Sequence, residues 1–197
     1  MAYYYLAAQL PGLSYGQAAP MSSRSFRELA GTALDAADAV WLDRCVLSPS
    51  GAGGVAQNGD VPEFFTRWSE WETALRLNLA RWRAARLKRE VSFDAPDYPV
   101  DAVSAAKAAA AMDSPLEAEI FLDEARWKAI DLFQGFDYFH RNTIYAYLLK
   151  LLLMERRACF KAEEGFTEYK GLYAAVMEAA GSGFGGAESK NQSGEPK

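Results

Sequence analysis

Apolar side chains recur at intervals of three or four residues along most of the chain, which is the spacing of one face of a helix. The clearest example lies within residues 62–90. Its apolar stripe consists of Trp68, Trp71, Leu75, Leu79 and Trp82. Pro62 suits the first turn of a helix, where its missing N–H group is not needed. The pattern therefore predicts a long amphipathic helix over residues 62–90.

Six more helices are predicted from the same spacing and from residues that favour helix starts. Ser22 or Ser23 can accept a hydrogen bond from a free backbone N–H group, and Asp35 is a candidate cap for the next helix. Ser114 and Pro115 begin a capping box. The six helices are expected to begin at Ser22 or Ser23, and to cover Ala36–Val46, Ala102–Ala111, Pro115 to about Gly135, about 137–162, and Phe166 to about Ala180.

The two long helices after Pro115 supply the other core candidates. They are Leu116, Ile120, Trp127, Ile130 and Phe133 from the first, with Phe136, Phe139, Ile144, Leu148, Leu151 and Leu152 assigned to the second.

The whole pattern predicts an all-α fold, because alternating strand patterns are nearly absent. We expect a multi-helix bundle of packed helical hairpins that forms a single domain over residues 1–180. A break at 91–101, which holds two prolines, is a candidate boundary between two small helical lobes. Residues 181–197 are rich in Gly, Ser, Glu and Lys and are predicted to be a disordered tail.

The opening stretch "MAYYYLAAQLPGL" does not have the pattern of a secretory signal. No Lys or Arg precedes Arg24, and Gln9 and Pro11 interrupt the apolar run. It is either a short extended segment or a first helix that ends before Pro11. The longest apolar run elsewhere, Ile144–Met154, is too short to span a membrane and contains Lys150. We therefore expect a cytoplasmic protein.

Charge and cysteine content narrow the partners. The formal net charge of −5 does not favour nucleic acid, whose phosphates require a clustered basic surface. Cys45 and Cys159 lie far apart in helical, apolar contexts and are expected to be buried, reduced thiols.

No catalytic constellation is evident. His140 is the only histidine, so neither a ferritin-like di-iron site nor a typical zinc site can be assembled. A Ser-His-Asp or Cys-His arrangement stays formally open, but a helix-end position beside Asp137 and Arg141 is the simpler interpretation of His140. The Gly-rich loop 48–60 lacks the spacing of a phosphate-binding motif. We predict no catalytic residue, no cofactor and no metal.

A cluster of acidic residues has a structural explanation in the sequence. Its members are Glu117, Glu119, Asp123 and Glu124, at the start of the helix that follows Ser114. Negative charge in a first turn interacts favourably with the helix dipole.

The long helix over residues 62–90 allows two interpretations. Its aromatic stripe can pack into a core and leave a solvated basic back, or it can form a docking surface, because Trp and Arg are enriched at binding hot spots. On the second interpretation the candidate partner-binding residues are Trp68, Trp71, Arg76 and Arg81. Binding to a membrane surface is less favoured, since Glu70, Glu72 and Asn78 dilute the basic face.

Several stretches resemble an uncharacterised bacterial family whose members are encoded among the components of V-type (A/V-type) ATP synthases. The stretches are "YYYLAAQLPGLSYGQAAPMSSRSF", "FFTRWSEWETALRLNLARWRAARL", "EIFLDEARWKAIDLF" and "FDYFHRNTIYAYLLKLLLMERRACF". Together they cover nearly all of residues 3–165. The family is similar to a reduced form of the funnel-shaped C-type component of these enzymes, whose eukaryotic counterpart is the d-type component.

The resemblance implies a non-catalytic, all-helical coupler between the central stalk and the membrane rotor ring of an ion-transporting ATPase. Its partners would be V-type ATPase subunits, and it would associate peripherally with the inner membrane through them. The alternative is a transient assembly or regulatory adaptor of the same complex. Either role implies that the opening tyrosines are a structural first segment of the fold.

Overall fold

The structure is a computed structural model that describes residues 3–48, 61–160 and 162–184; in the last range it describes the side chains of 165–179. Eight α-helices account for most of these residues, and no strand is present among them. The helices are α1 (Tyr4–Gln9), α2 (Ser23–Gly31), α3 (Ala36–Asp43), α4 (Glu63–Arg86), α5 (Val100–Ala111), α6 (Pro115–Gln134), α7 (Arg141–Ala158) and α8 (Ala162–Phe184). The predicted all-α class is confirmed.

The chain divides into two compact units between Cys159 and Phe160. The first unit holds α1 to α7, and the second holds α8. The division does not fall at the candidate boundary 91–101, because α4 and α5 on either side of that break pack against each other. The predicted single domain over residues 1–180 therefore includes a helix that belongs to the second unit.

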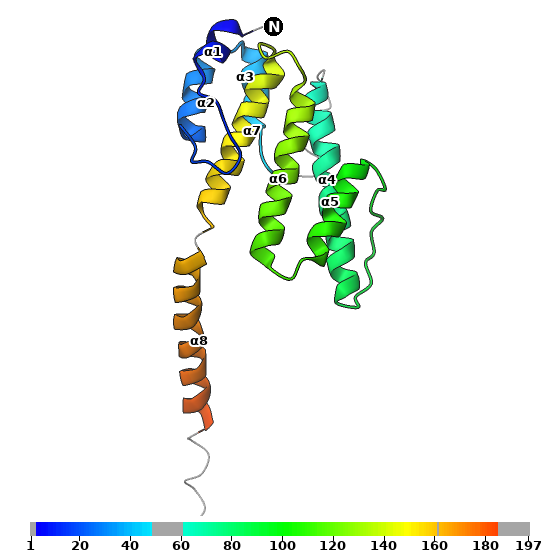
Figure 1. The fold of residues 1–197 in the computed structure, drawn as a ribbon, viewed down its shortest axis with the longest axis vertical. Coiled ribbons are helices and arrows are strands. Elements are labelled where there is room, and N and C mark those ends of the chain that lie inside the picture. The colour runs from blue at the N-terminus through cyan, green and yellow to red at the C-terminus, as the bar shows by residue number, and fades with distance from the viewer. Residues whose placement is uncertain (1–2, 49–60, 161, 185–197) are drawn as a thin grey trace, which may run out of the picture. The chain divides into compact units, whose positions relative to one another are not determined.

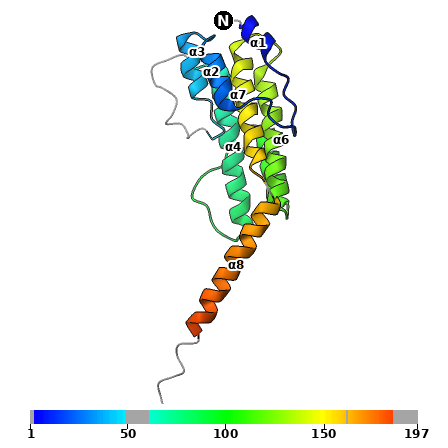
Figure 2. The same ribbon diagram turned by 90° about the vertical axis from the view of Figure 1, so that its left-hand side faces the viewer.

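The first unit is a bundle built around α4, α6 and α7. In Figures 1 and 2, α2, α7, α6 and α4 follow one another across the bundle, and each neighbouring pair is in contact. The fifth helix packs against both α4 and α6, and α3 packs against α2 and α7. The core between them is aromatic and aliphatic, with Phe26, Phe64, Leu122, Ile144 and Leu148 fully buried. Burial of this apolar surface is the main stabilising contribution to such a bundle.

The helix starts follow the predicted caps. Ser22 caps α2 by accepting a hydrogen bond from the Ser25 N–H group, and Asp35 caps α3 in the same way. Ser114 accepts from the Glu117 N–H group at the start of α6, with a proline in the first turn. The sixth helix ends before Gly135, whose φ of 75° lies in the left-handed region that favours glycine.

The N-terminal stretch is a structural part of the first unit. The Tyr3 N–H group donates to the Phe139 carbonyl at 2.6 Å, and Leu6 of α1 is buried. Farther along, the Tyr15 hydroxyl donates to the Ile120 carbonyl of α6 at 2.7 Å. Hydrogen bonds thus fix the segment to the bundle, and the helical alternative for residues 2–10 is the one adopted.

Three core assignments from the sequence are wrong. Phe136 is 96% exposed and Phe139 is 39% exposed, because α7 begins at Arg141 and not near residue 137. Leu116 is 38% exposed, because it lies in the first turn of α6, at the end of the bundle.

The histidine and the cysteines can now be placed. His140 is the N-cap of α7: its Nδ1 atom accepts from the Asn142 N–H group at 3.4 Å. Its helix-end position is thereby confirmed. Cys45 is buried as expected, whereas Cys159, at the end of α7, is exposed, so its predicted burial is wrong. Both thiols are free.

Several predicted boundaries shift by a few residues. The third helix ends at Asp43, before Val46, and α4 ends at Arg86 rather than at residue 90. The last helix runs on to Phe184, so residues 181–184 of the predicted disordered tail are helical. Residues 49–60 of the glycine-rich loop and residues 185–197 of the tail lie outside the described residues.

The second unit consists of α8, and all of its described side chains, 165–179, are exposed. Its large apolar side chains keep helical spacing: Phe166, Tyr169, Leu172, Tyr173, Val176 and Met177. Among the described residues, the helices of both units fall short of the length and apolar content that a membrane span requires.

A buried ionic network crosses the interface between α4 and α6. The Arg126 guanidinium of α6 donates two hydrogen bonds to the Glu72 carboxylate of α4, from Nε and Nη2, each at 3.0 Å. Its third contact, from Nη1, goes to Asp123 Oδ1 at 3.1 Å. The exposed fraction of these three side chains is 7% or less. A buried charge needs such compensation because desolvation of an unpaired ion is costly.

Asp123 also joins α7 to this network. Arg156 of α7 donates to Asp123 Oδ1 at 3.0 Å and to Glu119. Burial raises the pKa of the Asp123 carboxyl, and this effect outweighs the opposing influence of Arg156 and Arg126. Consistent with that direction, Asp123 Oδ2 is buried without a hydrogen-bond partner among the described residues. The network therefore connects three helices through one incompletely satisfied carboxylate.

Replacement of Arg126 by Ala would leave Glu72 and Asp123 buried without their central partner. We expect the free energy of unfolding to fall by about 3–5 kcal/mol, measured by urea denaturation. Arg24→Ala is the matched control, because Arg24 forms an exposed ion pair with Glu28 on α2 and its loss should change stability by no more than about 1 kcal/mol. Equal stability of the two variants would contradict the assigned role of the network.

Candidate functional site

Trp68 and Trp71 lie in the core of the first unit. Only 2% of Trp68 and 1% of Trp71 is exposed, and their rings stack with centroids 6.0 Å apart. The Trp68 indole N–H donates to the Val46 carbonyl at 3.2 Å, and that of Trp71 donates to Asp101 Oδ2 at 2.7 Å. Of the two interpretations of the aromatic stripe, core packing is therefore correct for these two residues, which have almost no surface to offer a partner.

Arg76 and Arg81 lie nearer the surface but already have intramolecular partners. Arg76 donates to Glu72 Oε1 at 2.7 Å and to the Ser48 hydroxyl. Arg81 lies 3.9 Å from Asp97 and places its guanidinium over the Trp82 ring. The structure does not bring Arg76 and Arg81 together with an exposed tryptophan. Their partner-binding role stays a prediction.

Trp68→Ala should lower the free energy of unfolding by about 3–5 kcal/mol, since it removes a large side chain from a closed core. Arg81→Ala should lower it by less than about 1 kcal/mol, because its ion pair with Asp97 is exposed. Urea denaturation of both variants checks the pair of values. A stable Trp68→Ala variant would place this side chain at the surface instead.

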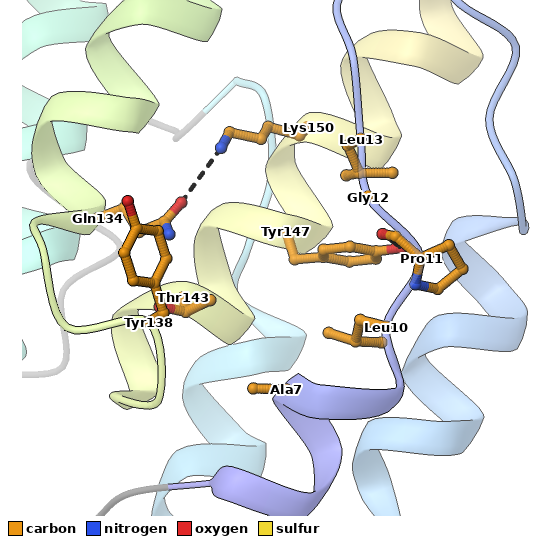
Figure 3. Close-up of a pocket in the computed structure, with 10 residues that line it drawn as sticks. All are labelled: Ala7, Leu10, Pro11, Gly12, Leu13, Gln134, Tyr138, Thr143, Tyr147 and Lys150. Carbon is orange, nitrogen blue, oxygen red and sulfur yellow. Dashed lines mark hydrogen bonds between the residues drawn. The ribbon is translucent and has the colours of Figure 1, made fainter.

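A different part of the first unit has the shape of a binding site. A cavity of about 310 Å³ lies between the N-terminal segment 7–13 and the facing parts of α6 and α7 (Figure 3). This volume is at the lower end of the range for small-molecule sites. Its lining residues are Ala7, Leu10, Pro11, Gly12, Leu13, Gln134, Tyr138, Thr143, Tyr147 and Lys150.

The two walls of the cavity differ in chemistry. Leu10 and Leu13 give the N-terminal wall an apolar surface, as Figure 3 shows. On the other side the Lys150 ammonium donates to Gln134 Oε1 at 3.1 Å and pairs with Asp131 at 2.5 Å. The Tyr147 hydroxyl closes the space between the walls by donating to the Pro11 carbonyl at 3.0 Å.

The polar wall offers hydrogen-bond donors. Among the described residues, neither the Gln134 amide nitrogen nor the Tyr138 hydroxyl has a hydrogen-bond partner within the chain. Amide N–H and phenol O–H groups beside an apolar wall suit a carbonyl or carboxylate that is flanked by an apolar group. The described lining contains no nucleophile hydrogen-bonded to a base, so the geometry of the cavity fits binding.

Exposed aromatic side chains surround the mouth of this cavity. We call them the aromatic patch: Tyr4, Tyr5, Phe136, Tyr138 and Phe139, from α1 and from the connection between α6 and α7. The Tyr4 and Phe139 rings are in contact, with centroids 4.8 Å apart, so the two segments form one surface. Tyr138 belongs to both the patch and the cavity. Gathered exposed aromatics of this kind mark protein interaction sites.

Buried hydrogen bonds to Asp38 hold the two segments of the patch in place. The Tyr3 hydroxyl donates to Asp38 Oδ2 at 2.6 Å, and the Tyr145 hydroxyl donates to Oδ1 at 3.0 Å. Arg141 Nη1 donates to the same Oδ1 atom at 3.3 Å. Tyr3 precedes the tyrosines of α1, and Arg141 follows the α6–α7 connection. The Asp38 carboxylate therefore fixes both segments relative to α3.

The electrostatics of this group favour a charged Asp38. Burial alone would raise the pKa of its carboxyl, but hydrogen bonds from Tyr3, Tyr145 and Arg141 outweigh burial and lower the pKa. Burial and the neighbouring carboxylate raise the pKa of both tyrosines, which therefore stay protonated donors.

Because the pKa of Asp38 is lower in the folded chain than in the unfolded chain, ionised Asp38 stabilises the fold above the unfolded pKa. That stabilisation is lost as the pH falls through the folded pKa. We expect Asp38→Asn to be less stable than the parent at neutral pH, and the difference to shrink as the pH falls from about 5 toward 2.

Urea denaturation at several pH values measures this difference. Asp43→Asn removes an exposed carboxylate from the same helix and should keep the pH dependence of the parent. A stability difference between parent and Asp38→Asn that is constant over the whole pH range would contradict the role of Asp38.

The aromatic patch could not be located from the sequence. Phe136 and Phe139 have helical spacing with core residues of α7, and this spacing assigned them to the core. A usable signal was the interval Gly135–His140, where a left-handed glycine, Asp137 and the capping histidine interrupt the helix. No three His, Cys, Asp or Glu side chains among the described residues are arranged so that they could hold a metal ion.

Comparisons with known proteins add no relative: no family model, curated protein or solved structure matches the chain. The resemblance to proteins encoded with V-type ATP synthases stays a prediction from sequence.

Proposed function

We propose that the protein is a non-catalytic subunit of a V-type (A/V-type) ATP synthase or ATPase. Within that complex it would act, like the C-type component, as a coupler between the central stalk and the membrane rotor ring. The proposal starts from the resemblance of residues 3–165 to proteins encoded in such operons. The all-helical fold is compatible with it.

The aromatic patch is the single observation that carries a docking role. Phe136 is almost fully exposed, and Tyr4, Tyr5 and Tyr138 also direct most of their surface to solvent. Desolvation of such rings on a partner would contribute more to binding than most polar contacts. The adjacent cavity would accept a side chain or carbonyl from the same partner.

A coupler must transmit force without deforming, and two features of the first unit suit that task. The Glu72–Arg126–Asp123 network joins α4 to α6, and Arg156 extends it to α7. The Asp38 group joins α3, α7 and the N-terminal segment in the same manner. Both groups resist sliding of one helix past another, because a shift would leave buried charges unpaired.

The test is a tagged pull-down from gently solubilised native membranes, with the stoichiometry of the components determined by mass spectrometry. We expect the catalytic and rotor subunits to be recovered with about one copy of this protein per complex. Substoichiometric recovery with an intact complex would favour the transient assembly or regulatory adaptor. Recovery of the tagged protein alone would overturn both roles.

A double variant tests the surface itself. Phe136→Ser with Tyr138→Ser should reduce recovery of the complex at least tenfold, because loss of two hot-spot rings costs more than about 1.4 kcal/mol. Stability should change little, since both side chains are exposed. Leu87→Ser with Val100→Ser is the matched control: these residues are also exposed but lie at the end of α4 and the start of α5. Equal recovery of the two double variants would exclude the patch as the interface.

A further inference from the structure

A second cavity, larger than the one in Figure 3, lies over Trp71 between α5 and α6. Its volume is about 420 Å³, within the range of small-molecule sites. The wall from α5 consists of Asp101, Ser104, Ala105 and Ala108, and α6 contributes Phe121, Glu124, Ala125 and Lys128. The short side chains of the three alanines leave the space open, and Phe121 gives it an aromatic wall.

Asp101 is held at the edge of this cavity by a hydrogen bond from the core. The indole N–H of the buried Trp71 donates to its Oδ2 atom at 2.7 Å. Within the described residues, no cation pairs with Asp101 and no second donor reaches its carboxylate. The carboxylate is thus oriented in advance and keeps an oxygen available for a ligand, which lowers the entropic cost of binding.

The charges that face the cavity leave an excess of negative charge. Glu124 pairs with Lys128 at 2.7 Å, but this pair is exposed and contributes little. A hollow of about 110 Å³ shares Trp71 and Asp101 with the cavity and adds Glu70 and Arg67 to its lining. Arg67 is already engaged by Glu63 and by the Phe133 ring. Asp101 and Glu70 therefore stay uncompensated on this side of α4 and α5.

We infer that the cavity over Trp71 binds an organic cation, an ammonium or guanidinium group carried on an apolar body. The cationic group would pair with Asp101, and the apolar body would lie against Phe121 and the alanines. A charge-assisted hydrogen bond to a fixed carboxylate, with an aromatic wall beside it, is the chemistry that selects such a ligand. The cation can belong to a free amine or to a Lys side chain of another protein.

The experiment uses the full chain labelled with ¹⁵N and titrated with phenethylammonium. Its matched probe, 3-phenylpropionate, has the same ring on a similar chain but the opposite charge. We expect phenethylammonium to shift the Trp71 indole N–H signal and the backbone signals of 104–108 and 121–125. A ligand of this size should bind with a dissociation constant on the order of 1 mM. Equal shifts with 3-phenylpropionate, or no shifts with either, would overturn the inference.

Two pairs of variants locate the binding. Asp101→Asn retains an oxygen that can accept from Trp71 but loses the charge, so the affinity for phenethylammonium should fall about tenfold. Asp94→Asn removes an exposed carboxylate from the 87–99 connection and should leave it unchanged. Ala108→Leu should fill the cavity and abolish the shifts, whereas Ala111→Leu on the same helix should not. Affinities that do not differ within either pair would overturn the inference.

A peptide arm distinguishes the two sources of the cation. The capped pentapeptide Ala-Leu-Lys-Leu-Ala presents one ammonium group on an apolar backbone, and its control has Glu in place of Lys. Binding of the Lys peptide tenfold tighter than phenethylammonium supports a side chain of a partner protein as the ligand. Equal or weaker binding of the Lys peptide supports a free amine, provided that the Asp101→Asn variant lowers both affinities.

Discussion

The Arg126 guanidinium sets the relation between the helices at the centre of the bundle. It lies in a nearly closed interior and directs its three hydrogen-bonding nitrogen atoms at two carboxylates, one on α4 and one on its own helix. A hydrophobic interface tolerates small rotations and shifts of register, because apolar contacts have little directionality. A planar guanidinium paired with Glu72 through two hydrogen bonds does not, since either movement breaks bonds that buried charges require. The positions of α5, the cavity over Trp71 and α7 all follow from this one crossing.

The sequence predicted the local features of the fold well. Ser22, Asp35 and Ser114 act as caps because capping depends on side chains within three residues of a helix start. Glu72, Asp123 and Arg126 were out of reach for the opposite reason. Glu72 and Arg126 are 54 positions apart, and helical spacing alone describes Glu72 as a dilution of a basic face. Pairing between helices becomes visible only once their relative position is known.

The same argument explains why the candidate binding residues moved. Composition pointed to Trp and Arg, and these types are indeed frequent at interfaces. Yet a tryptophan stripe on a long helix is also what a core requires, and the bundle buried it. The surface that stays aromatic comes from short segments, α1 and the α6–α7 connection, where no periodicity exists to be recognised. Exposure of Phe136 follows from where α6 stops and α7 starts, a boundary set by Gly135 and His140.

The hydrogen bonds of Asp38 have a consequence for synthesis of the chain. Asp38 lies 107 positions before Tyr145, and Tyr3 lies 35 positions before Asp38. A ribosome that adds about 5–20 residues per second needs roughly 5–20 s to proceed from Asp38 to Tyr145. During that interval the N-terminal tyrosines have no bundle to join. Helices such as α4 and α5 can pair as they emerge, but the first segment docks last, so the beginning of the chain completes the folding of its first unit.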